Sequence, residues 1–403
     1  MKPAHIIVVG AGPVGVVTAL ASAQRGFKVT LVESAAVVDD SPRAATTHSS
    51  TLEMIDSLGL SERFTAEGLV ARYFDFWDQP NHMLIARFDH ELLKDETKFP
   101  YVVQTEQHKL ARMGLDKLKE YPDVSVRFST RFESLAQNAD GVSVTLEENG
   151  EKETLRADYL VAADGASSSV RKALDIAFEG MTWAERFVVI TVRNDFEKLL
   201  GCCFRNYLAA PTEWGNLFKV SGDDGMGRWR VVYPSLNDSA DEAVLADGPV
   251  YERLQKICDL GAGYDIVHRN IYRVHQRVAA TFHKGRVFLA GDSAHVNNPI
   301  GGLGLNSGIH DAMELCEMLT SVQRGTDDVS VFDRYDRRRR DLNIEFVQQQ
   351  TIANKRRLEE QDASKRQAAL DELKSTADNP TLHKQFLMRT SLIDSVRKSK
   401  TIA

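Results

Sequence analysis

Two glycine-rich segments hold the residues whose types and spacing point most directly to chemistry. The first is GAGPVG, in which Gly10, Gly12 and Gly15 occupy the G-x-G-x-x-G positions, and the second is GDSAHVNNPIGGLGLN at 291–306. Glycine permits tight turns and close backbone approach, and a glycine-rich turn that opens a helix typically cradles an anionic or flat group. We therefore expect each segment to hold part of a ligand.

The elements around the first segment favour dinucleotide binding. HIIVVG has the apolar run of a buried parallel strand, VVTALASAQRG has helical spacing, and KVTLVE is a second buried strand that closes at Glu33. Gly10 allows the tight turn, Gly12 lets the backbone approach a pyrophosphate, and Gly15 lets the helix pack on the sheet. Glu33 can accept ribose hydroxyls and would repel a 2′-phosphate, which favours FAD or NAD over NADP. The alternative is a glycine-rich turn without a ligand.

The elements predicted further along the chain indicate an α/β unit interrupted by a second sheet. Buried strands recur at YLVAADG and KGRVFLAGD, whereas the segment from 182 to 233 has the aromatic and β-branched strands typical of an antiparallel sheet. Hairpins are expected between YFDFWD and MLIARF and at Asn149-Gly150. A capping box from Ser50 to Glu53 is expected to open a helix.

Composition excludes several classes of function. The 403 residues have a formal net charge of −7 and no sustained basic face, which argues against a nucleic-acid partner. We interpret the run from Arg337 to Arg340 as a solvated helix face or as ion pairs with Asp333, Asp336 and Asp341. The four cysteines lack metal-ligand spacing, so no metal site is expected. No apolar run is long enough to span a membrane, and we expect a cytoplasmic protein.

Three motifs stand in order along the chain: GAGPVG with Glu33, YLVAADGASSSVR (159–171) and GRVFLAGDSAHVNNPIGGLGLN (285–306). Together they resemble the single-component (class A) FAD-dependent aromatic hydroxylases, the family of para-hydroxybenzoate hydroxylase and phenol hydroxylase, over residues 1 to 345. PRA, TWAERFVV and YRVHQRVAATFHKGRV are most similar to para-nitrophenol and hydroxypyridine monooxygenases. The resemblance implies an α/β fold with a discontinuous Rossmann-like FAD-binding domain (1–72, 98–180 and 276–345), an inserted, mostly antiparallel β-sheet substrate domain (73–97 and 181–275) and a helical C-terminal segment (346–403).

The resemblance also implies which residues hold FAD. The first turn would hold the ADP half, and the late glycine loop would lie against the isoalloxazine ring, whose negative charge on reduction is stabilised by N–H groups at a helix N-terminus. The candidates are Gly10, Gly12, Gly15, Glu33, Arg43, Gln107, Asp164, Gly165, Asp292, Pro299, Gly301, Gly302, Gly304, Leu305 and Asn306.

The chemistry implied by the family is hydroxylation of a phenol-like or hydroxypyridine ring, with or without loss of a ring substituent. NADH or NADPH, bound transiently, reduces a tightly but non-covalently bound FAD, and O2 then reacts through a C4a-hydroperoxyflavin. The partners expected are therefore a small aromatic or N-heteroaromatic substrate and O2, with no nucleic acid and no membrane. The charged helical C-terminus is a candidate homodimer element.

Candidates for catalysis and substrate contact carry both a functional and a structural interpretation. His48 would be a base or hydrogen-bond partner near the flavin, or simply a loop histidine, and aromatic rings of the inserted sheet would line a flat pocket or pack in the core. The catalytic candidates are His48, Pro299 and Tyr207, and the substrate-binding candidates are His48, Tyr207, Trp214 and Tyr233. Arg186 and Arg205 could each bind a substrate carboxylate or form an ordinary ion pair.

Two other functions are consistent with some of these sequence motifs. A halogenase, epoxidase or oxidase of the same flavin fold is one alternative, although the W-x-W-x-I-P signature of halogenases and the membrane anchor of such epoxidases are absent from the sequence. A non-catalytic protein that keeps only the dinucleotide fold is the other. Such a protein would be expected to lose the loop against the flavin ring, and here PIGGLGLN is intact.

Overall fold

A parallel sheet forms one half of the protein, for which a computed structural model describes residues 3–41, 43, 45–236 and 238–403. Its strand order is β18-β19-β12-β1-β2-β8. The strands are β1 (His5–Val9), β2 (Lys28–Val32), β8 (Val124–Arg127), β12 (Tyr159–Ala162), β18 (His283–Lys284) and β19 (Val287–Leu289). All neighbouring pairs are parallel except the hairpin β18–β19. The apolar runs of the sequence thus form the predicted Rossmann-like sheet.

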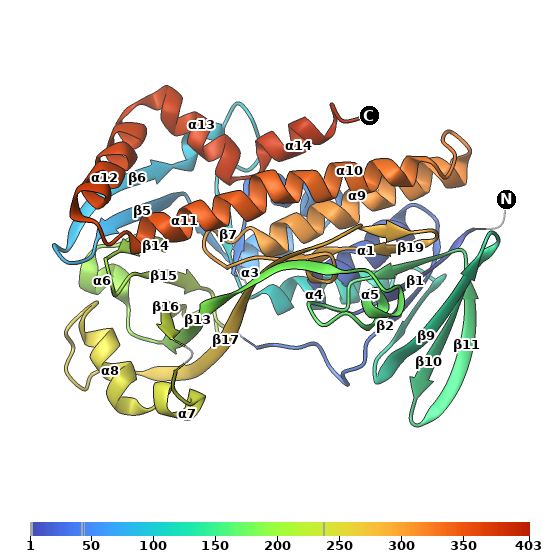
Figure 1. Ribbon diagram of the computed structural model, residues 1–403, viewed down its shortest axis with the longest axis horizontal. Helices are drawn as coiled ribbons and strands as arrows, with labels where there is room; N and C mark the ends of the chain where they lie inside the picture. Colours follow the sequence, from blue (N-terminus) through green and yellow to red (C-terminus); the bar gives the residue numbers. More distant parts are fainter. Residues whose placement is uncertain (1–2, 42, 44, 237) are drawn as a thin grey trace.

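Helices cover this sheet and bury its strands. α1 (Pro13–Gln24) packs against both α4 (Gln107–Leu118) and α9 (Gly304–Arg324) (Figure 1). Ile6, Ile7 and Val8 of β1 are completely buried, which explains why this strand has no polar residue in its centre. A side chain at Gly15 would place its Cβ 1.8 Å from the carbonyl oxygen of Gly10, so only glycine lets α1 approach the sheet this closely.

A second, larger sheet has the strand order β20-β17-β13-β16-β15-β14-β5-β6. Its strands are β5 (Tyr73–Asp78), β6 (Met83–Asp89), β13 (Phe178–Val192), β14 (Arg205–Ala209), β15 (Gly215–Val220), β16 (Arg228–Leu236), β17 (Ile266–Ala279) and β20 (His295–Val296). Every pair is antiparallel except β14–β5. The predicted mostly antiparallel inserted sheet is confirmed. The long strands β13 and β17 cross the predicted domain boundaries, and that division of the chain stays a prediction.

The two faces of the second sheet belong to separate hydrophobic cores. Phe187, Tyr207 and Val232 face the core that also contains residues of the C-terminal helices, whereas Val188 and Tyr233 face the opposite core beside α8 (Asp247–Gln255). The core of the parallel sheet is a third cluster that shares no buried residue with these two. Because neighbouring residues of a strand point to opposite faces, a one-residue difference in position decides which core a side chain joins.

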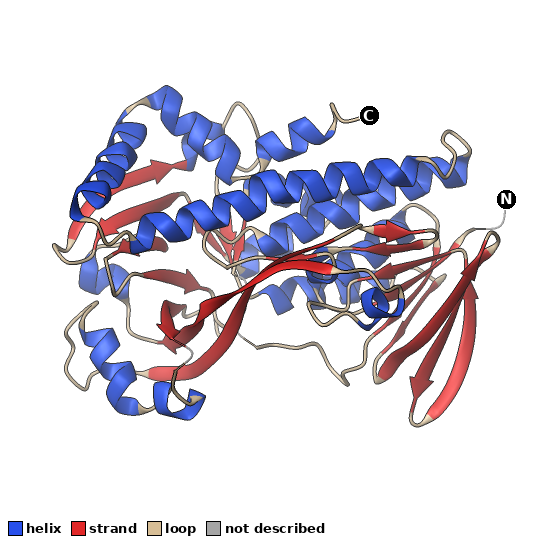
Figure 2. Ribbon diagram, viewed as in Figure 1, coloured by secondary structure: helices blue, strands red, loops and turns tan. Residues whose placement is uncertain are grey.

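The C-terminal helices form a layer along one side of the protein (Figure 2). They are α10 (Val331–Leu342), a π-helical turn η3 (Asn343–Gln348), α11 (Gln349–Glu359), α12 (Ala363–Asp378), α13 (Pro380–Thr390) and α14 (Ile393–Ser399). α12 packs against β6, and α13 packs against η1 (His90–Leu93), so this layer covers the strands at one edge of the second sheet.

The four consecutive arginines of α10 each bond to another segment of the protein, although only Arg339 is buried. Arg337 and Arg338 donate to carbonyl groups of Ala403 and Ile402, and Arg340 donates to a backbone carbonyl of β17. Arg339 is buried and pairs with a carboxylate of α9. The predicted ion pairs with Asp333 and Asp336 are therefore wrong. Of the three predicted aspartates, Asp341 forms an ion pair with one of these arginines, Arg340, at 3.8 Å.

Local turn predictions met different outcomes. The hairpins β5–β6 and β10–β11 are confirmed, the latter turning at Asn149 and Gly150, both with positive φ. The predicted capping box is wrong: helix α2 begins at Ser49, and the Ser50 hydroxyl donates instead to the carbonyl of Ser391 at 2.7 Å.

The remaining elements are β3 (Thr46–Thr47), α2 (Ser49–Ser57), α3 (Ser61–Glu67), β4 (Leu69–Ala71), β7 (Val102–Gln104), β9 (Thr130–Asn138), β10 (Gly141–Glu148), β11 (Glu151–Ala157), α5 (Ser169–Ala173), α6 (Phe196–Leu200), α7 (Asp241–Val244) and η2 (Gly291–Ser293). No helix in the described part of the chain has the length and apolar character to cross a bilayer.

Candidate active site

The sequence motifs meet at one edge of the parallel sheet. Glu33 follows β2, Gly10 follows β1, Asp164 follows β12 and Gly291 follows β19, and these four strands are neighbours in the sheet. Because parallel strands present their carboxyl ends at the same edge, the four motifs lie together at that edge, the position of the crevice in which ligands of open α/β sheets bind.

The turn between β1 and α1 has the shape of a phosphate cradle. Gly10 has a φ of +105°, and a Cβ added at Gly12 would meet no atom within 4 Å, so space remains open above the turn. No side chain caps α1, which leaves the N–H groups of its first turn for a ligand. The Glu33 carboxylate accepts from the backbone N–H groups of Ala11 (2.8 Å) and Ala35 (2.9 Å), which fixes it beside the cradle.

The segment that contains Asp164, Gly165 and Arg171 is hydrogen-bonded to the turn after β19. Asp164 accepts from the N–H of Val170 at 3.2 Å through Oδ2, its Oδ1 is buried without a partner, and burial raises the pKa of this carboxyl. The next residue, Gly165, has a positive φ. Arg171 donates to the carbonyl of Ser293 at 2.7 Å, so both blocks are held in one arrangement.

Other predicted FAD residues are more exposed or lie on neighbouring elements. Asp292 is exposed on η2, and Gln107 is the first residue of α4. Arg43 is exposed and forms an ion pair with Asp39 at 3.0 Å. Pro42 and Ala44, the other residues of the PRA segment, lie outside the described residues.

The late glycine loop precedes α9 and is locked to the segment before α2. Gly301 and Gly302 have φ values of +110° and +68°, and Pro299 accepts from the N–H of Gly302 at 3.0 Å. The Asn306 side chain accepts from the N–H of His48 at 2.8 Å and donates to the carbonyl of Thr46 at 2.9 Å. Gly304 and Leu305 form the first turn of α9, which no side chain caps. Asn306 thus holds the histidine against the loop.

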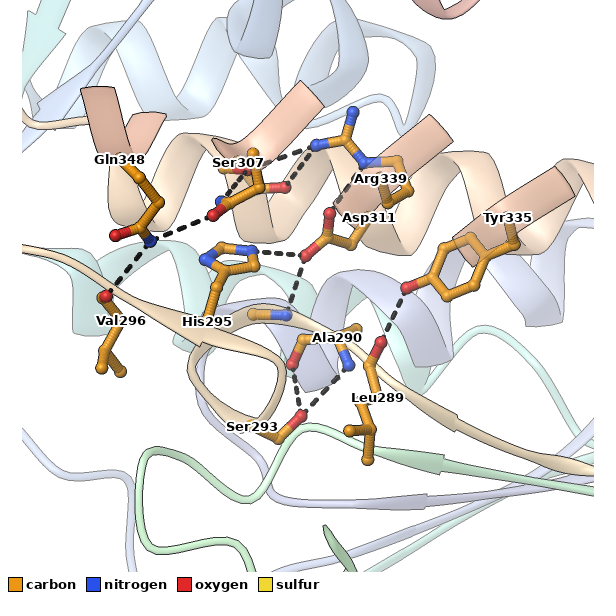
Figure 3. A network of polar contacts seen from close by, with 12 residues as sticks. Leu289, Ala290, Ser293, His295, Val296, Ser307, Asp311, Tyr335, Arg339 and Gln348 are labelled. Carbon is orange, nitrogen blue, oxygen red and sulfur yellow. Dashed lines mark hydrogen bonds and ion pairs between the residues drawn. The ribbon is translucent and has the colours of Figure 1, made fainter. Parts of the chain in front are cut away.

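A buried charge network fixes the other end of this loop (Figure 3). Asp311 of α9 accepts from the N–H of Gly291 (3.0 Å), from Nε2 of His295 (2.8 Å) and from Nε of Arg339 (2.7 Å). Burial alone would raise the pKa of Asp311, but His295 and Arg339 hold it below its usual value. A single carboxylate therefore links the turn that carries Asp292 to the helix that follows the glycine loop.

A pocket lies between this loop, the second sheet and the C-terminal helices, with about 390 Å3 of space free of protein atoms, part of which is open to solvent. Its apolar lining consists of Phe74, Phe76, Ile300, Leu303, Leu358 and Phe386. Its polar lining consists of His48, Arg205, Tyr207, Gln350, Asn354 and Thr390. Three phenylalanines, a tyrosine and a histidine thus contribute aromatic rings to the lining, which suits a planar ligand.

His48 has one defined tautomer in this cavity. Its Nε2 lies 2.9 Å from the carbonyl oxygen of Gly301, which can only accept, so Nε2 carries the proton. Nδ1 is buried and has no partner, and its lone pair is available to a hydrogen-bond donor. Burial, reinforced by the positive charge of Arg205, lowers the pKa of His48 well below 6.5, and the imidazole is neutral at neutral pH.

The remaining substrate candidates separate according to the sheet face on which they lie. Tyr207 lines the cavity and accepts from Arg205 at 3.0 Å. Trp214 is buried beside Phe187 and does not line the cavity. Tyr233 lies on the opposite face of the sheet, with Arg253 over its ring, and does not line the cavity. The cavity lining does not include Pro299 either.

A family described as an FAD binding domain matches residues 4–350 of the chain. The para-nitrophenol 4-monooxygenase of a Pseudomonas species is 34% identical over 390 residues, which is 95% of this chain and 94% of that protein. This chain belongs to the FAD-dependent aromatic hydroxylase family. A second member, the 6-hydroxy-3-succinoylpyridine 3-monooxygenase of Pseudomonas putida, is 32% identical and is covered to 88% in each chain. The crystal structure of p-nitrophenol 4-monooxygenase from Pseudomonas putida has a TM-score of 0.90 at 32% identity, covering 96% of this chain and 98% of that one.

The residues of this aromatic hydroxylase fit the cofactor of its family. The open space at Gly12, the uncapped α1 and the fixed Glu33 suit the ADP half of FAD, and the partnerless Oδ1 of Asp164 provides a buried acceptor in the same crevice. The uncapped start of α9 suits the end of the flavin that becomes negative on reduction. Bound here, FAD supplies the redox chemistry with O2, and the protein supplies position and electrostatics.

Two glycines of the first turn should respond differently to substitution by alanine. In Gly12→Ala the new Cβ meets no protein atom, so we expect a folded hydroxylase whose FAD affinity falls by about tenfold or more because the methyl group occupies ligand space. In Gly15→Ala the Cβ would clash with Gly10, and we expect loss of thermal stability even before FAD is added. Thermal unfolding of the apoprotein and FAD titration separate the two effects. Equal FAD affinity in Gly12→Ala and wild type would contradict this placement of the pyrophosphate.

Sequence reasoning missed the contribution of the C-terminal helices to the cavity. Gln350 and Asn354 of α11 and Phe386 and Thr390 of α13 line it, although the C-terminal segment was expected only as a candidate dimer element. Phe74 and Phe76 of β5 were missed as well. The alternation of YFDFWD places these two rings on one face of a strand, but nothing in the pattern says what that face contacts.

Proposed function

We propose that this FAD-dependent aromatic hydroxylase acts on a small phenol or hydroxypyridine whose ring hydroxyl donates a hydrogen bond to Nδ1 of His48. The observation that carries the proposal is the buried, partnerless Nδ1 in a cavity with aromatic walls. A buried acceptor without a partner costs free energy, which a hydroxyl of the substrate recovers when it binds.

The arrangement of His48 suits orientation of the ring and withdrawal of its hydroxyl proton. The proton on Nε2 is held by Gly301, so the imidazole presents only a lone pair to the cavity. A hydrogen bond from the substrate hydroxyl to this lone pair shifts electron density toward the ring carbons, which favours attack by an electrophilic oxygen. Asn306 holds the backbone of His48 to the glycine loop, so the hydroxyl is positioned relative to the flavin side of the site.

The walls of the cavity suit a reaction that must exclude water. Phe74, Phe76 and Phe386 come from β5 and α13, and Ile300 and Leu303 come from the glycine loop. Because both apolar surfaces meet at the cavity, a bound aromatic ring would displace water from the side of the site nearest the loop. A dry site limits loss of the activated oxygen to solvent.

The names of similar proteins support the same class of substrate. The relatives at 34% and 32% identity are named for para-nitrophenol and for 6-hydroxy-3-succinoylpyridine, two ring compounds that carry a hydroxyl group and a second substituent. We propose a substrate of this kind for the present chain, with NADH or NADPH as the transient reductant. Tyr207 and His48 are the residues proposed to contact the ring or its hydroxyl, and the fifteen FAD residues predicted from the sequence keep their proposed role.

The test measures consumption of NADH, NADPH and O2 by the FAD-loaded protein with phenols, nitrophenols, hydroxybenzoates and hydroxypyridines. We expect one class of ring compound to stimulate consumption strongly and to yield a hydroxylated product that incorporates an atom from isotopically labelled dioxygen. Halide-dependent product would instead identify a halogenase. Protein that binds FAD but is not stimulated by any ring compound would overturn the proposed substrate class.

A further inference from the structure

We propose that Arg205 binds a negatively charged substituent of the substrate, such as a carboxylate, while His48 binds the ring hydroxyl. The proposal rests on the function proposed above and specifies its substrate further. Its basis is a buried guanidinium in the cavity that lacks a counter-charge among the described residues.

Arg205 projects from β14 into the cavity. It is only 3% exposed, and its Nη2 donates to the Tyr207 hydroxyl at 3.0 Å. Nε and Nη1 are buried and have no hydrogen-bond partner, and no carboxylate within the described part of the chain forms an ion pair with this side chain. A guanidinium carries five N–H donors, so most of its hydrogen-bonding capacity is unused.

Other buried arginines of the protein donate to a carboxylate or to backbone carbonyls, although Nε of Arg186 and Nε of Arg230 have no partner. Arg186 pairs with Asp241, and Arg339 pairs with a carboxylate of α9. Arg171 and Arg230 each donate to backbone carbonyls. Arg205 has only a neutral hydroxyl as its acceptor. The contrast between Arg186 and Arg205, which lie on opposite faces of the same sheet, separates the two interpretations that the sequence left open.

Aromatic rings hold the Arg205 guanidinium in place without neutralising it. Its Cζ lies 4.9 Å from the ring centroid of Phe74 and 5.9 Å from that of Tyr207. Such contacts attract a cation but offer no acceptor to the N–H groups in the guanidinium plane. Burial of an ionised group without a counter-charge is costly, and an anion brought in by the substrate removes that cost.

His48 and Arg205 divide the functional groups of the substrate between them. The neutral imidazole of His48 presents a lone pair, which repels an anion and accepts from a hydroxyl. Arg205 presents only donors and a positive charge, which suit an oxygen anion and do not require a hydroxyl proton. A ring with a hydroxyl at one position and an anionic group at another therefore has one favoured orientation in the cavity.

The test compares ligands that differ in charge but hardly in shape. Dissociation constants of 4-hydroxybenzoate and its methyl ester are measured by the change in absorbance of the bound flavin, without turnover. We expect the wild-type protein to bind the acid about tenfold or more tightly than the ester. In Arg205→Met this preference should disappear, and in Arg205→Lys part of it should remain because the charge is kept but the planar donor set is lost.

Arg186→Met is the matched control, because it removes a buried arginine of the same sheet that lies outside the cavity. Its acid-to-ester preference should equal that of the wild type, and FAD content shows that each variant is folded. A wild-type protein that binds acid and ester equally, or an Arg205→Met variant that retains FAD and the full preference, would overturn the proposal.

A further ligand, 4-cyanophenol, shows whether Arg205 binds the anionic second substituent of the ring or the ionised ring hydroxyl. Its acidic hydroxyl ionises readily, but its second substituent carries no oxygen. Unchanged affinity for 4-cyanophenol in Arg205→Met supports the division of roles between Arg205 and His48. A loss that appears only at pH values at which its hydroxyl is ionised would mean that Arg205 binds the ring oxygen, and would overturn that division. Because binding is measured apart from turnover, absence of hydroxylation would count against the proposed function and not against the role of Arg205.

Discussion

Replacement of His48 by phenylalanine should lower kcat/KM for hydroxylation by about 10- to 100-fold, because a hydrogen bond in a buried site, strengthened as the hydroxyl gives up its proton, contributes about 1.5–3 kcal/mol. Phenylalanine keeps the volume and planarity of the ring but removes the free Nδ1 acceptor. With the ring poorly oriented, a larger fraction of the NAD(P)H consumed should yield hydrogen peroxide and no product. Steady-state rates with product quantification measure both effects.

His90→Phe is the matched control for this substitution. His90 is also buried, and burial together with the charge of Arg205 lowers its pKa to about 3, but it does not line the cavity. We expect near wild-type coupling of NAD(P)H consumption to product in this variant. Should His48→Phe retain FAD and hydroxylate with a kcat/KM within about twofold of wild type, His48 would not be the residue that receives the substrate hydroxyl.

The pKa of His48 also fixes how its role depends on pH. Burial keeps the imidazole neutral down to values well below 6.5, so its Nδ1 stays an acceptor throughout the neutral range. Protonation would remove that acceptor only as the pH falls toward the lowered pKa. Changes in substrate affinity between pH 6.5 and 8 should therefore follow ionisation of the ligand and not of this histidine.

Replacement of Asp311 by asparagine should destabilise the protein by about 3–5 kcal/mol, because it leaves the buried Arg339 without a counter-charge. It should also raise the dissociation constant for FAD by about tenfold or more, since the same carboxylate positions the N–H of Gly291 and the turn that carries Asp292. Thermal and chemical unfolding measure the first effect, and titration of the apoprotein with FAD measures the second.

Asp333→Asn provides the comparison, because Asp333 of α10 is exposed and its partner His283 belongs to β18, outside the network. An ion pair whose carboxylate is exposed to solvent contributes about 0–1 kcal/mol, so FAD affinity and stability should be almost unchanged. If Asp311→Asn were no less stable than Asp333→Asn, the buried network in Figure 3 would have no structural role.

Features with a local cause could be predicted from the sequence. The apolar run before Gly10, the glycine turn and the acid at the end of the next strand depend on neighbouring residues, and all three lie as expected along the sheet edge. The hairpin at Asn149-Gly150 depends on two residues that tolerate positive φ. Such features need no knowledge of the rest of the fold.

Features decided by tertiary contacts could not be predicted. Ser50 fits a capping box, but its hydroxyl is used by Ser391, more than three hundred positions away. Arg186 and Arg205 have the same chemistry and lie in similar strands, yet only the face of the sheet determines which one meets a carboxylate. Tyr233 is an aromatic residue of the second sheet, as a substrate contact would be. Its side chain, however, points to the core on the face opposite the cavity.

The separation of the hydrophobic cores should let substitutions beside the cavity act independently of the core beneath the FAD crevice. The cluster beneath the FAD crevice contains no residue of α12 or α13, whereas Leu373 and Leu387 of these helices belong to the cluster beside the cavity. Substitutions at sites without shared contacts have nearly additive effects on stability. Substitutions around Phe386 and Thr390 should therefore reshape the ring-binding cavity with little effect on the stability of the core beneath the FAD crevice.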